Sequence, residues 1–160
     1  MHSIRRTAAA RVPQLSKEDL LLSGALLYWA EGYKRPRVRD GNEITAHTIS
    51  FVNSDPDMIR VFISFLKIVI GIEQKNIRAT MRLYAHINER LALSYWASVT
   101  GLSSEAFRKT TFLISGASKS RRPYNRLPYG TLQIEVQRTD KFNELMGLIQ
   151  GVKEQISMLL

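Results

Sequence analysis

Residues 76–85 alternate between apolar and polar side chains, and this alternation limits the possible folds more than any other feature of the sequence. A side-chain period of two is typical of a β-strand, in which successive side chains point to opposite faces of a sheet. One face of this segment must therefore be buried, while the other faces water. Residues 130–138 repeat the pattern. The apolar positions are Ile77, Ala79, Met81 and Leu83 in the first segment and Leu132, Ile134 and Val136 in the second.

Helical segments are interspersed with these strands. The segment Lys17–Ala30 is apolar almost all round, follows a capping pair formed by Ser16 and Asp19, and stops before Gly32. Such a helix is buried on most sides or packs against a partner. Three more helices are predicted at about Pro56–Ile70, Asn88–Val99 and Lys141–Leu160, and three more strands at Tyr33–Arg39, Ile44–Asn53 and Phe107–Ile114.

The order of these elements predicts an α+β fold, in which an antiparallel sheet has helices packed on its apolar face. The chain has 160 residues, which suits one domain, and its apolar fraction of 44% is sufficient for a core. We expect a single domain over residues 16–160, preceded by a basic, poorly ordered arm over residues 1–15. Residues 115–128 are basic and rich in Ser, Pro and Gly, so they predict a loop.

Charge and cysteine content narrow the functional classes. The chain has 23 Lys and Arg against 14 Asp and Glu, a formal net charge of +9, and no Cys. The positive charge favours a polyanionic partner such as nucleic acid. The lack of Cys excludes disulfides, thiolate zinc sites and cysteine nucleophiles. No apolar run is long enough to cross a bilayer and the first residues lack an apolar signal core, so we expect a cytoplasmic protein without a membrane partner.

The polar face of the predicted sheet concentrates basic side chains. Arginine binds phosphates and guanine, and glutamine reads adenine, so this face has the chemistry of a double-stranded DNA interface. The basic loop adds arginines that can follow a phosphate backbone. The alternative is that these charges serve solubility. The predicted DNA-binding residues are Lys34, Arg35, Arg37, Arg39, Arg78, Arg82 and Gln133, with Arg121, Arg122 and Arg126 in the loop.

The segment Leu22–Gly32, with the sequence LSGALLYWAEG, ends in an acid and a glycine before the predicted hairpin. It resembles the LAGLIDADG helix of homing endonucleases, and the order of elements is similar to the αββαββα core of that fold with an extra helix at Asn88–Val99. From about Leu20 to Ile156 the chain more closely resembles a poorly characterised family of bacterial proteins, many of which carry an upstream helix-turn-helix segment that is not found here. The motifs that carry this second resemblance are Leu27–Gly32, Asn53–Pro56, His86, Trp96 and Phe107–Lys109.

The LAGLIDADG resemblance implies a DNA endonuclease that depends on a divalent metal. In that family two such helices pack side by side, the acid at the end of each binds metal, and the sheets form a saddle over DNA. Glu31 matches that acid. The resemblance therefore implies a catalytic and metal-binding role for Glu31, Mg²⁺ as cofactor, and a homodimer formed through the first helix. Two carboxylates placed in this way can hold Mg²⁺ against a scissile phosphate.

Other interpretations stay open from the residues alone. Glu31 can be an ordinary helix-end acid whose unfavourable position in the helix dipole is relieved by Lys34 or Arg35. The chain can also be a non-catalytic DNA-binding regulator, or a protein-interaction module that docks a partner helix on the apolar stripe of its C-terminal helix. That stripe comprises Phe142, Leu145, Ile149, Val152, Ile156 and Leu159.

Overall fold

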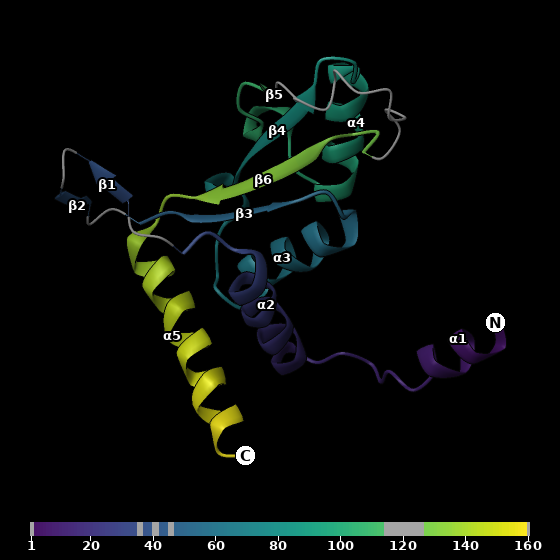
Figure 1. Cartoon of the computed structure of the whole chain (residues 1–160), viewed down its shortest axis with the longest axis vertical. Coiled ribbons are helices and arrows are strands. Elements are labelled where there is room, and N and C mark those ends of the chain that lie inside the picture. The colour runs from purple at the N-terminus through teal and green to yellow at the C-terminus, as the bar shows by residue number, and fades with distance from the viewer. Residues whose placement is uncertain (1, 35–36, 40–41, 45–46, 114–126, 160) are drawn as a thin grey trace.

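A computed structural model describes residues 2–34, 37–39, 42–44, 47–113 and 127–159 (Figure 1). Five α-helices, six strands and two short 3₁₀ helices follow one another in these parts of the chain. The helices are α1 (His2–Ala9), α2 (Lys17–Glu31), α3 (Pro56–Ile68), α4 (Glu89–Thr100) and α5 (Thr139–Ser157), with 3₁₀ turns η1 (Gln74–Asn76) and η2 (Ser104–Ala106). The strands are β1 (Arg37–Arg39), β2 (Asn42–Ile44), β3 (Ile49–Asn53), β4 (Arg78–Tyr84), β5 (Thr111–Leu113) and β6 (Thr131–Val136).

A four-stranded sheet with the order β3-β6-β4-β5 forms the centre of the molecule. Strand β6 pairs antiparallel with both β3 and β4. The alternation predicted for β4 is confirmed, because its odd-numbered residues are buried and its even-numbered residues are partly exposed. The α+β prediction, with helices packed against a sheet, is also confirmed.

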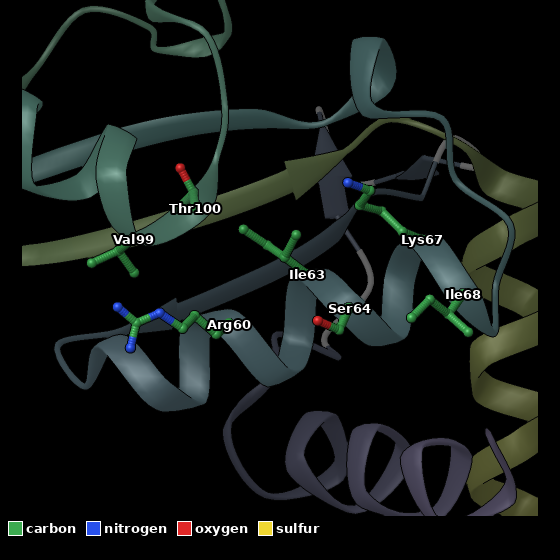
Figure 2. A pocket seen from close by; sticks show the side chains of 7 residues that line it. All are labelled: Arg60, Ile63, Ser64, Lys67, Ile68, Val99 and Thr100. Carbon is green, nitrogen blue, oxygen red and sulfur yellow. The ribbon is translucent and has the colours of Figure 1, made fainter. Parts of the chain in front are cut away.

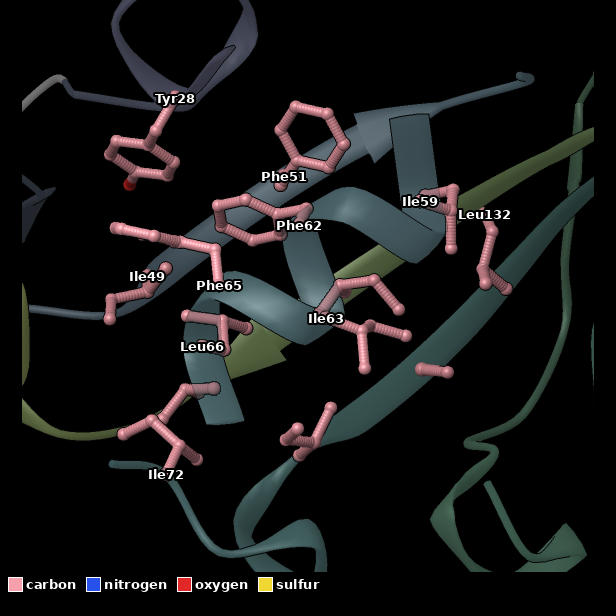
Figure 3. Packing of buried hydrophobic residues seen from close by; sticks show 14 of the residues in the cluster. Tyr28, Ile49, Phe51, Ile59, Phe62, Ile63, Phe65, Leu66, Ile72 and Leu132 are labelled. Carbon is pink, nitrogen blue, oxygen red and sulfur yellow. The ribbon is translucent and has the colours of Figure 1, made fainter. Parts of the chain in front are cut away.

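The core lies between the apolar face of the sheet and the helices (Figure 3). Helix α3 contacts β3, α4 contacts β4, and α2 packs on both α3 and β3. Aromatic rings fill the junction of α2, α3 and β3: the Phe62 ring centroid lies 4.4 Å from that of Phe51 and 5.7 Å from that of Tyr28. These rings, together with Phe65, are fully buried. The fold therefore fixes α2 firmly against the sheet.

The predicted helix boundaries have the expected caps. At the start of α2 the Asp19 amide donates to Ser16 Oγ and the Ser16 amide donates to Asp19 Oδ2, which is a complete capping box. Asp55 accepts from the amides of Asp57 and Met58 at the start of α3. Gly101 ends α4 with φ of +66°, a left-handed conformation that favours glycine.

The structure differs from the sequence-based expectation in three places. Residues His2–Ala9 form helix α1 rather than a poorly ordered arm, and the segment contains arginine and alanine, which favour a helix. The predicted hairpin over Tyr33–Asn53 is divided, so that β1 and β2 pair with each other outside the main sheet while β3 joins it. The sheet is mixed rather than antiparallel throughout, because β5 pairs parallel with β4.

The stripe predicted on the C-terminal helix is mostly internal. Four of its side chains are buried in the core of the domain, and Lys153 extends over α2, with Nζ 5.0 Å from the centre of the Trp29 ring. Ile156 and Leu159 are exposed. The buried members of the stripe are Phe142, Leu145, Ile149 and Val152.

Among the described residues, no helix combines the length and the apolar character that crossing a membrane requires.

Candidate nucleic-acid interface

The sheet face opposite the core is polar, and its rows follow from the strand register. Ser50, Glu135 and Arg78 lie side by side across β3, β6 and β4. The next row contains Gln133 between Val52 and Thr80, and Arg82 lies beside Thr131 in the row beyond. The residues that sequence analysis predicted on β4 and β6 therefore do share one face. We call this surface, defined by Ser50, Arg78, Thr80, Arg82, Gln133 and Glu135, the polar sheet face.

A chain of side-chain hydrogen bonds crosses the polar sheet face. Arg82 donates from Nε and Nη2 to Gln133 Oε1 at 3.1 and 2.6 Å, and Gln133 Nε2 donates to Ser50 Oγ at 3.0 Å. Because Gln133 is neutral, the two hydrogen bonds that it accepts from Arg82 orient the guanidinium without cancelling the positive charge of Arg82. The result is a cation with a fixed orientation on a partly exposed surface.

Arg78 is held in a comparable way. Its Nη1 donates to the carbonyl oxygens of Lys75 and Ile77 at the start of β4. Carbonyl oxygens are neutral acceptors, so these bonds also leave the arginine charge in place. Two of the predicted DNA-binding arginines thus lie on β4 with their guanidinium groups anchored by neutral partners.

An ion pair that sequence analysis missed lies on the same face. Arg108 Nη1 contacts Glu135 Oε2 at 2.9 Å, and the Glu135 side chain is only 11% exposed. Sequence analysis identified Arg108 in a motif and Glu135 as a polar strand residue, but nothing in either pattern connects positions 27 residues apart. The pair neutralises the acid of the polar sheet face, so Arg78 and Arg82 set the net charge of that face.

The end of α2 is built around Tyr28 and Gly32. The Tyr28 hydroxyl donates to the Tyr33 carbonyl at 2.7 Å and accepts from the Ser50 amide at 3.4 Å. Burial raises the pKa of Tyr28 to about 12, so the hydroxyl remains protonated and able to donate. A Cβ on Gly32 would lie 2.3 Å from the Tyr28 ring, so only glycine fits there. The Leu27–Gly32 motif therefore has a structural role in joining α2 to β3.

Two of the sequence-predicted residues lie at this helix end. Glu31 is the last residue of α2 and is exposed. Lys34 Nζ donates to the carbonyls of Trp29 and Gly32, both at 2.8 Å, so its ammonium caps the α2 C-terminus. A cation at this position offsets the helix dipole. By binding these carbonyls, the Lys34 ammonium offsets the negative end of the helix dipole, where the Glu31 carboxylate lies.

The remaining predicted residues are only partly described. Arg37 and Arg39 belong to β1, where they pair in register with Ile44 and Asn42 of β2. This hairpin precedes β3 and lies beyond the start of that strand (Figure 1). Arg35, Arg121, Arg122 and Arg126 lie outside the described residues.

Few side chains of the described residues are placed to bind a metal ion. Among the described residues there is no cluster of three or more His, Asp and Glu side chains able to hold a metal ion. Glu31 alone offers one carboxylate per chain. Mg²⁺ is commonly bound by one or two carboxylates together with substrate phosphates and water. Glu31 therefore meets the minimum for Mg²⁺ only when a nucleic-acid phosphate, or a second copy of Glu31, completes the site.

A groove of about 290 Å³ lies in the helical layer, between α3 and the end of α4 (Figure 2). Its basic side chains already have partners: Arg60 pairs with Asp57 at 2.7 Å and Lys67 donates to Gln74. None of the residues predicted for DNA or metal binding lines it. The groove is therefore separate from the polar sheet face.

Searches against protein-family models, curated proteins and solved structures find no match to this chain.

Proposed function

We propose that this protein binds double-stranded DNA through the polar sheet face. The observation that carries the proposal is the anchoring of Arg78 and Arg82 by neutral oxygens, which leaves on one sheet two oriented cations that form no ion pair with an acid of the described residues. An arginine whose geometry is already fixed loses less side-chain entropy when it binds a phosphate. The overall charge of +9 supports the same partner by attracting a polyanion over long range.

The polar sheet face also offers groups that can read bases. Gln133 lies at its centre and is partly exposed, and Thr80 and Thr131 flank it. Amides and hydroxyls hydrogen-bond base edges in the major groove. The hairpin β1–β2, which precedes β3, has Arg37 and Arg39 in one of its strands. A two-stranded ribbon of this kind fits the major groove, which is about 12 Å wide.

The proposal predicts a specific loss of DNA binding in the double variant Arg78→Ala/Arg82→Ala. Each lost phosphate contact should lower the slope of log affinity against log salt by about one, so the double variant should lose about two. The measurement is fluorescence anisotropy with a labelled duplex about three helical turns long, titrated at several salt concentrations.

The control is Arg60→Ala/Arg90→Ala, which removes the same charge from exposed positions on α3 and α4. An equal loss in the control would mean that net charge, rather than the polar sheet face, drives binding. If the wild-type chain failed to bind DNA even at low salt, the proposed function would be wrong.

Pairing of two chains through α2 is the second part of the proposal. Leu22, Leu26 and Trp29 are 47%, 43% and 37% exposed, and their spacing places them on one side of the helix, opposite the buried Gly24. An exposed apolar stripe of this kind is typical of an interaction surface. The pairing would bring two α2 helices together, each with Glu31 as its last residue. The LAGLIDADG resemblance suggests a metal-dependent endonuclease built on this pair.

For the endonuclease, we expect nicking of plasmid DNA that requires Mg²⁺ and is lost in Glu31→Gln. That substitution removes the carboxylate charge that a metal needs while keeping the size of the side chain. Glu18→Gln, at the exposed start of the same helix, should leave nicking unchanged. Sedimentation should give twice the mass of one chain. DNA binding by a monomer without cleavage would instead favour the non-catalytic regulator.

A further inference from the structure

Strand β4 ends in an aromatic residue that lies next to the polar sheet face. The even-numbered residues of β4 are partly exposed and alternate with buried odd-numbered residues along the whole strand. Tyr84, the last residue of β4, therefore lies on the same side of the sheet as Arg82, two positions earlier. Alternate residues of a strand are about 7 Å apart, so the tyrosine adjoins the anchored guanidinium of Arg82.

The Tyr84 ring is held in place without being enclosed. It packs against the buried core on one part of its surface, and its side chain is partly exposed. The Ile87 amide donates to the Tyr84 carbonyl, which closes a turn and brings the exposed His86 beside the tyrosine. The two rings are almost parallel, with an interplanar angle of 6° and centroids 6.1 Å apart. We call Tyr84 and His86 the aromatic pair.

The distance between these two rings leaves aromatic surface uncovered. Rings that overlap fully have centroids about 3.5–4.0 Å apart, the optimal separation of carbon atoms in contact. Tyr95 and Tyr129 stack in this way, with centroids 3.8 Å apart, so each ring covers a face of the other. At 6.1 Å the parallel rings of the aromatic pair are separated or displaced sideways, and they do not cover each other. A third flat ring can therefore stack against them.

We propose that the aromatic pair takes one unpaired base of a DNA duplex, which stacks on Tyr84 while Arg82 binds a phosphate of the same strand. This inference rests on the proposed DNA-binding function. An aromatic ring beside a phosphate-binding cation is a combination by which proteins bind unstacked bases. The spacing of about 7 Å between Arg82 and Tyr84 equals about two steps of 3.4 Å along a DNA strand, so the phosphate and the base belong to neighbouring nucleotides.

The state of the base determines which DNA is preferred. In a paired duplex both faces of a base are covered by its neighbours in the stack, so the base cannot also stack on Tyr84. Taking a base out of the stack costs free energy, and this cost is lowest for a base that is already mismatched or unpaired. The protein should therefore bind a duplex that contains an unpaired base more tightly than a fully paired one.

The test compares two labelled duplexes about three helical turns long, one fully paired and one with a single unpaired adenine near its centre. The wild-type chain should bind the second duplex about 5- to 100-fold more tightly, the gain expected from one base stacked on an aromatic side chain. Tyr84→Leu should abolish this preference and keep the affinity for the paired duplex, because leucine still packs against the core. Tyr84→Phe should retain the preference, because it retains the ring.

Phe112→Leu is the matched control. Phe112 is 52% exposed on β5 and lies in register with the buried Leu83, so it belongs to the opposite side of the sheet from Tyr84. This variant also loses an exposed ring and should keep the preference. A fluorescent aminopurine in place of the unpaired adenine reports stacking directly, because stacking on an aromatic ring quenches its emission. The quenching should persist in Phe112→Leu and be lost in Tyr84→Leu.

Equal wild-type affinity for the two duplexes would overturn the inference, as would an equal loss of preference in Tyr84→Leu and Phe112→Leu. Loss of the preference in Tyr84→Phe would overturn it in favour of a role for the hydroxyl group. Binding of a free single strand as tight as that of the duplex with the unpaired base would overturn it in favour of single-strand binding.

The same measurements separate this inference from the proposed function. If the preference for the unpaired base were absent, binding of the paired duplex that remained sensitive to Arg78→Ala/Arg82→Ala would leave the proposed function standing. Conversely, a preference that depended on Tyr84, with no loss of binding in that double variant, would support base stacking and contradict phosphate binding by the polar sheet face.

Discussion

Replacing Phe62 with alanine is expected to lower the free energy of unfolding by about 3–5 kcal/mol, the range found for large aromatic deletions in a packed core. Phe62 is fully buried, and its ring lies between those of Phe51 and Tyr28, with Phe65 close by on the same helix. Truncation would leave a cavity where α2, α3 and β3 meet. Because domains are stable by only about 5–15 kcal/mol, this loss is a large part of the total.

Urea denaturation followed by circular dichroism measures this loss. Phe112→Ala is the matched control, since Phe112 is 52% exposed on the short edge strand β5 and loses much less contact on truncation. Similar losses in the two variants would contradict the assignment of the α2–α3–β3 junction as the core. An unchanged midpoint for Phe62→Ala would contradict the packing itself.

Replacing Gly24 with alanine is expected to destabilise the domain by about 3 kcal/mol, the upper end of the range for overpacking. A Cβ at this position would lie 2.1 Å from Cγ of Phe65 and 2.6 Å from its Cβ. Phe65 is fully buried and cannot turn away without disturbing the aromatic cluster. Helices α2 and α3 would therefore have to move apart.

Gly147→Ala supplies the comparison for Gly24→Ala. Gly147 lies within α5, and a Cβ there would meet nothing within 4 Å. The same change should stabilise the protein by about 0.5–1 kcal/mol, because alanine favours a helix more than glycine does. The difference between the two variants isolates the steric contribution at Gly24. Stabilisation by both would show that α2 has room for a side chain against α3.

Local patterns predicted the elements of this fold well where a single segment carries the information. The alternation in β4, the Ser16–Asp19 capping box and the left-handed stop at Gly101 each depend on a few adjacent residues. The parallel pairing of β5 with β4 and the separation of β1–β2 from the main sheet were not predicted. Strand direction and partner are set by packing between distant segments, which the local pattern does not contain.

In the candidate site too, local patterns predicted which residues share a face but not the contacts between distant residues. Arg78, Arg82 and Gln133 could be assigned to one face from the period of two alone, and the strand register confirms that assignment. Sequence patterns could not predict the hydrogen bonds that orient Arg82, which join residues 51 positions apart. They could not predict the ion pair between Arg108 and Glu135 either, because these residues are 27 positions apart. The position of Lys34 depends on how the chain leaves α2, so sequence analysis weighed it as a DNA contact and as a partner for Glu31 without deciding between them.

The way in which the sheet ends limits how copies of this protein can assemble. On one side, β3 is bordered by an isolated bridge between Gly32 and Phe51, with the Tyr33 amide donating to the Ser50 carbonyl. On the other side, the described part of the last strand, β5, has three residues, and an isolated bridge joins Phe107 to Ala79 of β4. Short or covered edges resist the addition of a strand from another molecule. Growth of the four-stranded sheet from one copy into the next is therefore disfavoured at these described edges, which favours a helix surface such as the exposed side of α2 as the place where two copies join without forming open-ended fibres.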